Sequence, residues 1–153
     1  MTIAQPATVH ASAVLVGARA ALIRGPSGAG KSWLALELIA AARTGLLAFA
    51  RLVGDDRVHL EAAGGRLLAR PAEALAGLIE VRGAGPLRLA YEPSAVVGFV
   101  VDLAAADSSR LPDDAERQTE IEGIRLPRLA VAAGAAALPG VLALINSARE
   151  SWA

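Results

Sequence analysis

The residues with the clearest chemical meaning lie in the stretch GPSGAGKSW, residues 25–33. Its glycines, lysine and serine satisfy the pattern G-x-x-x-x-G-K-[ST]. In such a loop, glycines let successive backbone N–H groups point toward a phosphate chain, and the following helix presents its positive end. Lys31 would pair with the outer phosphates, and the Ser32 hydroxyl would bind the magnesium that bridges them. The pattern predicts a phosphate cradle made of Gly25, Pro26, Ser27, Gly28, Ala29, Gly30, Lys31 and Ser32.

The alternative interpretation of this stretch is an ordinary turn between a strand and a helix, matched by chance in a glycine-rich chain. Against it, Lys31 is the only lysine among fifteen basic side chains. A compact ammonium suits a pair of phosphates better than a broad guanidinium does. We therefore interpret the stretch as a phosphate-binding loop.

Two adjacent carboxylates, Asp55 and Asp56, come next, after the apolar residues 46–53. An acidic residue at the end of a strand beside a phosphate loop commonly holds magnesium, and a neighbouring carboxylate can accept the proton of an attacking hydroxyl. Taken alone, the triplet beginning at Gly54 also fits a solvated turn. With a phosphate loop in the same chain, we expect the acidic pair to serve the phosphate site.

The stretch IEVRGAG, residues 79–85, places Glu80 and Arg82 on one face of an alternating strand. They fit either a solvent-facing ion pair or a magnesium ligand beside an arginine that neutralises phosphate. Gly83 and Gly85 would make the following segment mobile. His10 and His59 have no partner at helical spacing, so we expect neither to bind a metal, but His10 precedes a strand expected next to the loop and could lie near the reacting centre.

Composition limits the classes of protein that remain. The chain has 153 residues without a repeat or linker, so we expect one domain, residues 1–153. Fifteen acidic side chains balance the basic ones, which disfavours nucleic acid and anionic membranes as partners. The absence of cysteine excludes disulfides and thiolate sites and suits a cytoplasmic location. No basic residue precedes Arg19, so a secretory signal is not expected.

The elements that must position these residues form a strand-rich pattern. Residues 12–16 and 20–24 read as strands leading into the loop, and apolar residues recur at helical spacing from Leu34 until Thr44. Residues 57–61 and 79–82 alternate as half-buried strands, and Gly64-Gly65 offers a turn.

The second half of the chain contains fewer residues that suggest chemistry, but its strands and helix can still be predicted. Residues 96–101 read as a strand covered on both faces, and residues 107–116 as a proline-broken loop. Short strands are expected at 120–124 and 126–131. The uncharged residues 129–148 contain two glycines and a proline, so we expect a buried or partly buried helix there and no membrane span. Its apolar stripe is Leu138, Val141, Leu142, Ile145, Ala148 and Trp152.

Three stretches in this order and spacing, HASAVLVGARAALIRGPSGAGKS, RLVGDD and IEVRGAG, resemble the catalytic domain of bacterial HPr kinase/phosphorylase over roughly residues 8–130. The resemblance implies an α/β phosphate-loop fold related to phosphoenolpyruvate carboxykinase, with a strand-rich mixed sheet, a loop helix and a C-terminal helix, rather than a parallel doubly wound sheet. It implies ATP- and Mg²⁺-dependent phosphorylation of a serine on an HPr-like carrier, with pyrophosphate as another donor, reverse phosphorolysis in many members, and a hexamer.

Carried over by position, Lys31 resembles the phosphate-binding lysine and Ser32 a magnesium ligand. Asp55 resembles the acid/base that takes the serine proton, with Asp56 assisting the metal and phosphate, although the exchange of these two roles stays open. Glu80 resembles a further magnesium ligand. In the same way, the histidine at position 10 resembles one close to the catalytic aspartate, where it would make activity depend on pH.

Three departures from the family pattern qualify this interpretation. The chain starts where the catalytic domain usually begins, so the N-terminal domain of longer members is not expected. Trp33 stands where many members have glutamate, so a candidate carboxylate is missing from the site. The stretch AVAAGAAALPG lacks the arginine of the usual Pro-Gly-Arg-Asn loop, and the loss of that arginine puts the reverse reaction in doubt. A nucleotide-binding regulatory module and a small-molecule kinase therefore remain as alternatives to a protein-serine kinase.

Overall fold

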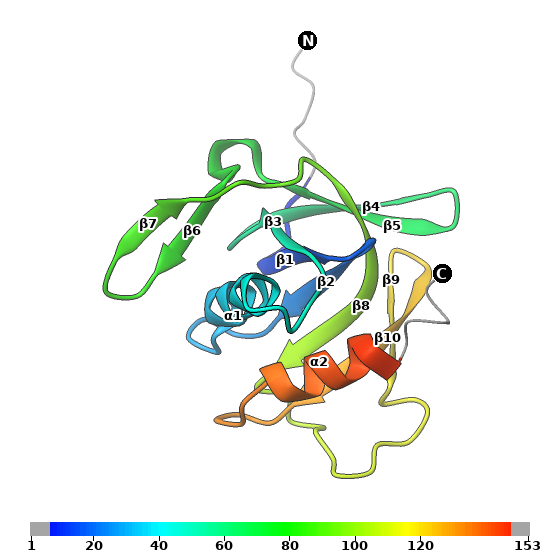
Figure 1. Ribbon diagram of the computed structural model, residues 1–153. Helices are drawn as coiled ribbons and strands as arrows, with labels where there is room; N and C mark the ends of the chain where they lie inside the picture. Colours follow the sequence, from blue (N-terminus) through cyan, green and yellow to red (C-terminus); the bar gives the residue numbers. More distant parts are fainter. Residues whose placement is uncertain (1–6, 148–153) are drawn as a thin grey trace.

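The centre of the molecule is a mixed β-sheet, seen in a computed structural model that describes residues 7–147. Its main path runs β3-β1-β2-β8-β10-β9, and the hairpin β4–β5 joins it through β5 and β8 (Figure 1). The strands of this sheet are β1 (Ala11–Val16), β2 (Arg19–Arg24), β3 (Ala50–Gly54), β4 (Val58–Ala63), β5 (Arg66–Pro71), β8 (Ala95–Leu103), β9 (Gln118–Ile121) and β10 (Ile124–Val131). Strand β8 runs parallel to β2 and β10, and the other pairs are antiparallel. The expected strand-rich mixed sheet is confirmed.

A hairpin leads directly into the predicted phosphate loop. Strands β1 and β2 pair from Val16 opposite Arg19 to Ala11 opposite Arg24, with the turn at Gly17. The loop follows β2, and helix α1 (Lys31–Arg43) begins immediately after it and ends at Thr44. The two strands and the helix predicted from the sequence are therefore confirmed.

Apolar side chains from the two faces of the sheet form two cores. Alternate residues of β2 divide between them, so that Ile23 packs toward the helices and Leu22 toward the opposite face. Helices α1 and α2 (Leu138–Ser147) both contribute to the first core, and residues of β4 and β5 belong to the second. Strand β8 supplies Phe99 to one core and Val100 to the other, which confirms that it is covered on both faces.

A second, two-stranded sheet stands apart from the main one. It consists of β6 (Leu78–Val81) and β7 (Gly85–Arg88), preceded by a single 3₁₀ turn, η1 (Glu73–Leu75). Figure 1 shows this hairpin projecting beside the N-terminal end of α1. Ile79 is buried in the first core, so the base of the hairpin is attached to the body of the protein.

Two sequence predictions need correction at the C-terminal half. The strand expected at 120–124 is interrupted, because Glu122 and Gly123 both have positive φ angles (51° and 77°) and make a two-residue hairpin turn between β9 and β10. Of the helix expected within 129–148, the first three residues instead belong to β10, and α2 begins only at Leu138. Ala148 and Trp152 of the predicted stripe lie outside the described residues. In the described part of the chain, none of the helices is long and apolar enough to cross a membrane.

Candidate phosphate-binding and catalytic site

The predicted phosphate loop joins the carboxyl end of β2 to the amino end of α1. Gly28 and Gly30 have φ angles of 83° and 100°, in the left-handed region that glycine adopts without steric cost. The first helical hydrogen bond of α1 is donated by the N–H of Leu34 to the Gly30 carbonyl, at 2.9 Å. The N–H groups of the three preceding residues have no helical acceptor, so they are available to an anion at the positive end of the helix.

Lys31 lies against this loop and is only 7% exposed. Its Nζ atom donates hydrogen bonds to the Gly25 carbonyl at 2.8 Å and to the Pro26 carbonyl at 3.1 Å. The single ammonium of the chain is thus held over the loop, where phosphate oxygens would replace these carbonyls as its partners.

Asp55 is the most enclosed acidic residue of the site, with 3% of its surface exposed. The hydroxyl of Ser32 lies 2.8 Å from both of its carboxylate oxygens, and the hydroxyl of Ser12 donates to Oδ1 at 2.5 Å. The backbone N–H of Glu80 donates to Oδ2 at 3.3 Å. Donors from β1, α1 and β6 therefore meet at one carboxylate, which ties the phosphate loop to three separate elements.

Asp56 has quite different surroundings from its neighbour. Its φ angle is 67°, and its side chain is 60% exposed. The Nε2 atom of His10 lies 3.0 Å from its Oδ1 atom. Because of the left-handed backbone, the two adjacent carboxylates face different ways: Asp55 toward the buried serines and Asp56 toward His10 and solvent.

A cleft of about 520 Å³ gathers most of the predicted site residues. Glu80 and Arg82 both line it, although β6 ends at Val81 and Arg82 lies in the following turn rather than on the strand. His59 is not among its lining residues, and its Nδ1 atom lies 3.2 Å from the Ala7 carbonyl. The remaining lining residues are His10, Ser27, Gly28, Gly30, Lys31, Ser32, Trp33, Leu36, Asp56 and Val81.

The donor set suits magnesium bound together with phosphate. Among residues 7–147, no three carboxylate or histidine side chains converge on one point, so the protein has no metal cage of its own there. Magnesium is usually held by one or two protein oxygens and by substrate phosphates, and it prefers hard oxygen donors. The hydroxyl of Ser32 and the carboxylates beside it fit that requirement.

An ion-pair network holds the strand residue that precedes the loop. Arg24 makes two hydrogen bonds of 2.7 Å with Asp102 of β8, and Arg128 of β10 bonds Asp102 at 2.6 Å and Asp107 at 2.8 and 2.9 Å. Burial alone would raise the pKa of Asp102, but the hydrogen bonds and positive charges of the two arginines outweigh it, and the pKa lies below its ordinary value. The network fixes the entry to the loop against two neighbouring strands. Sequence analysis missed these residues and Ser12, because a lone polar residue in an apolar strand has no recognisable pattern.

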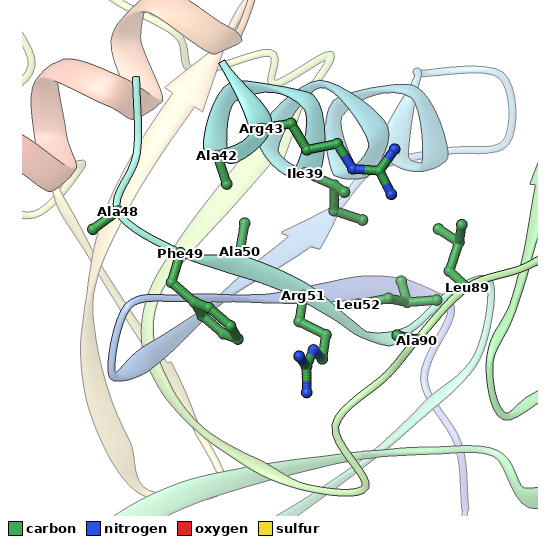
Figure 2. Close-up of a pocket in the computed structure, with 10 residues that line it drawn as sticks. All are labelled: Ile39, Ala42, Arg43, Ala48, Phe49, Ala50, Arg51, Leu52, Leu89 and Ala90. Atoms are coloured by element: carbon green, nitrogen blue, oxygen red, sulfur yellow. The ribbon is translucent and has the colours of Figure 1, made fainter. Parts of the chain in front are cut away.

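Two further hollows border the site or lie beyond it. One, of about 340 Å³, lies on the other side of the phosphate loop and is bordered by the uncharged residues 131–135. The second, of about 330 Å³, lies at the far end of α1 (Figure 2). Figure 2 shows the guanidinium groups of Arg43 and Arg51 pointing away from each other, and Arg51 is paired with Glu92 at 2.9 Å. These arginines therefore do not form a joint anion site.

The fold and the loop together define the class: a mixed α/β domain in which a glycine-rich loop of the phosphate-binding pattern joins a strand to the first helix. Comparison with known proteins gives the family. The family described as the HPr Serine kinase C-terminal domain matches residues 1–137, so the chain belongs to that family.

Its relatives include the HPr kinase/phosphorylases of Streptococcus thermophilus strain LMD-9 and Streptococcus sanguinis strain SK36. They are 31% identical over 140 residues and 33% identical over 141 residues, and each match covers 84% of this chain and 43% of the relative. The chain thus spans less than half the length of these curated relatives. The solved structure of the HPr(Ser) kinase/phosphatase from Coxiella burnetii has a TM-score of 0.76 at 23% identity, covering 95% of this chain and 98% of that one, which supports the fold.

Proposed function

We propose that the protein transfers the terminal phosphate of ATP to a serine hydroxyl of an HPr-like phosphocarrier protein. The observation that carries the proposal is that the loop meets both aspartates, in a chain of the HPr serine kinase family: Ser32 is bonded to the buried Asp55, and Asp56 lines the same cleft as the loop. A phosphate loop alone serves many acceptors, so the acceptor class rests on the family. By the same resemblance we propose a cytoplasmic homo-oligomer, hexameric as in other members.

In this proposal, residues 25–32 hold the ATP phosphates and Lys31 neutralises their charge, with Arg82 assisting. Magnesium, when bound, screens the negative charge between nucleophile and phosphate, and we assign Ser32 and Glu80 to it. Asp55, already bonded to Ser32, would orient that hydroxyl and add negative charge beside the ion.

We assign the proton-accepting role to Asp56, although the family resemblance favoured Asp55 with the exchange of the two roles left open. Asp56 is exposed to the cleft and paired with His10, whereas Asp55 is buried and already accepts three hydrogen bonds from other groups. A general base must reach the proton that it removes. The serine oxygen would bond to the γ-phosphorus, the bond from that phosphorus to ADP would break, and the serine proton would pass to Asp56.

A nucleotide-binding regulatory module is the second candidate function. The turn 131–135, which borders the phosphate loop, offers only alanine, glycine and valine side chains, so it supplies no charge to a transferring phosphate. Phosphorolysis needs inorganic phosphate as the acceptor. The lack of a charged side chain in this turn therefore weakens the case for that reaction most.

The test incubates the purified protein with ATP, magnesium and an HPr-like carrier and measures phosphoserine on the carrier by mass spectrometry. We expect transfer by the wild type and a loss of at least about 100-fold in the rate for Asp56→Asn, with ATP affinity measured by calorimetry little changed. Asp55→Asn should weaken the magnesium-dependent part of ATP binding. Asp114→Asn, an exposed change in the loop between β8 and β9, is the matched control.

Other outcomes separate the alternatives. A wild type that binds ATP but transfers no phosphate under any condition would contradict the kinase and favour the regulatory module. If Asp55→Asn abolishes turnover with ATP binding intact while Asp56→Asn keeps it, the two aspartates have the reverse roles.

A further inference from the structure

Trp33 is an exposed aromatic residue in the cleft that the phosphate loop lines. Its surface is 63% exposed, although it belongs to the first turn of α1 and lines the same cleft as the phosphate loop. Leu36 and Val81 also line this cleft. The indole is therefore accessible to a ligand bound in the cleft.

The helix geometry fixes the direction of this indole relative to the acidic residues. Successive residues of an α-helix point about 100° apart around its axis. Because the Ser32 side chain points to Asp55, the Trp33 side chain leaves the helix in another direction, shared with Leu36 three residues later. Trp33 and Leu36 therefore form an apolar wall of the cleft on α1, whereas Asp56 and His10, which also line it, come from the segments that follow β3 and precede β1.

A bound nucleotide has a phosphate end and a base end, and both must fit in this cleft. The free N–H groups of Lys31, Ser32 and Trp33 face the phosphates that the loop holds. If the terminal phosphate lies toward Asp56, the sugar and base must leave in the opposite direction. Among the cleft-lining residues of the first turn of α1, Trp33 alone has an aromatic side chain on which a base can stack.

We propose that Trp33 is the platform on which the purine base of the bound nucleotide stacks. The inference rests on the proposed ATP site and extends it from the phosphates to the base. Stacking on an aromatic face suits any purine, so the residue would favour nucleotides over pyrophosphate or tripolyphosphate without selecting ATP over GTP. A side chain of the acceptor protein is the competing occupant of this wall, but the acceptor serine has to approach from the side of the acidic pair.

The test uses the natural fluorescence of Trp33. Trp152, the second tryptophan, lies outside the described residues and is replaced by Trp152→Phe, so that the signal comes from one indole. Magnesium with ATP or GTP should quench this fluorescence, whereas magnesium with tripolyphosphate should leave it nearly unchanged.

Calorimetry then measures the contribution of the indole to affinity. Trp33→Ala should weaken ATP binding by about tenfold and leave tripolyphosphate binding within about twofold, because only the base loses its partner. Trp33→Phe should restore most of the ATP affinity. Leu111→Ala, which truncates an apolar side chain that is 80% exposed and lies outside the cleft lining, is the matched control and should change neither affinity.

The possible results distinguish this inference from the proposed function. ATP binding that is equal in Trp33→Ala and wild type overturns the stacking role but leaves the kinase intact. Unchanged ATP binding with a raised KM for the carrier assigns the wall to the acceptor and also overturns the inference. A wild type that binds neither ATP nor tripolyphosphate contradicts the proposed function itself.

Discussion

At the scale of single residues, Gly54 shows how closely the backbone is packed just before the acidic pair. It is the last residue of β3, and its φ angle is not in the left-handed region. A Cβ atom at this position would lie 2.8 Å from Val58 Cγ1 and 3.1 Å from the Cα atom of Pro71. The second neighbour is backbone and cannot rotate away, so glycine is required here for space.

Gly54→Ala should lower the free energy of unfolding by about 1–3 kcal/mol, because the added methyl group displaces β3 or its neighbours. The shift would also move Asp55, so we expect weaker magnesium-dependent ATP binding. Urea unfolding and calorimetry measure the two effects. The matched control is Gly140→Ala in α2, where the new Cβ would meet Leu129 at an ordinary 3.4 Å and helix propensity would favour alanine. Equal stability of the two variants would contradict the packing argument.

The same scale shows how far the sequence could predict the site. The loop, Asp55, Asp56, Glu80 and Arg82 could be predicted as site residues because phosphate chemistry restricts residue type and spacing. The sequence could not predict that Asp55 is buried and Asp56 exposed. This difference follows from the left-handed backbone of Asp56 and from the hydrogen bond of Ser12 to Asp55. Both depend on how β1 and β3 pair, which the local sequence does not encode.

At the scale of elements, hydrophobic periodicity predicted most strands but not their order. Strand β8 lies between β2 and β10 in the sheet, although β2 is distant from both in the sequence. It also pairs with β5. Periodicity reports which residues are buried and carries no information about the neighbouring strand. The turn at Glu122-Gly123 was missed because Glu122 continues the alternation of polar and apolar residues, so that residues 120–124 read as a single strand.

The Arg24–Asp102–Arg128 network is the contact that couples three of these strands. Asp102 is 15% exposed at its side chain, and it is the acceptor for both guanidinium groups. Removing its charge takes the charged partner from Arg24 and leaves Arg128 paired with Asp107 alone. We therefore expect the pairing of β2, β8 and β10, and with it the base of the phosphate loop, to depend on this carboxylate.

Asp102→Asn should lower the free energy of unfolding by about 2 kcal/mol at neutral pH, less than a fully buried pair would lose, because Arg24 is 34% exposed. The pKa of Asp102 is lowered in the folded state, so its contribution is present above the ordinary value of 3.8 and is lost as the pH falls through the lowered pKa. The difference between variant and wild type should thus narrow below about pH 4 in urea unfolding. Glu92→Gln, at the more exposed pair with Arg51, should cost less than about 1 kcal/mol at any pH. A difference for Asp102→Asn that persists unchanged at acidic pH would contradict the role of the charge.

At the scale of the whole molecule, the candidate site is assembled from several elements that are separated in the sequence. The phosphate loop is supported by α1 and β2, Asp55 by β3, and Glu80 by the hairpin β6–β7, whose Ile79 is buried beneath α1 residues in the first core. A ligand that bridges the loop and the acidic pair would therefore bind the folded domain and have no comparable site in the unfolded chain. Ligands of this kind stabilise the fold in proportion to their affinity.

Magnesium with ATP should raise the melting temperature of the wild type by about 5–10 °C at a concentration about 100 times the Kd, since this saturation adds about 2.7 kcal/mol to a domain of this size. Lys31→Ala should lose most of that shift, because the ammonium over the loop is the only lysine charge available to the phosphates. Arg43→Ala removes a cation from the opposite end of the same helix and should keep the full shift. Scanning calorimetry of the three proteins with and without nucleotide measures the effect. Equal shifts in Lys31→Ala and wild type would mean that the nucleotide binds away from the loop, since a ligand stabilises the fold only through the contacts that it makes in the folded state.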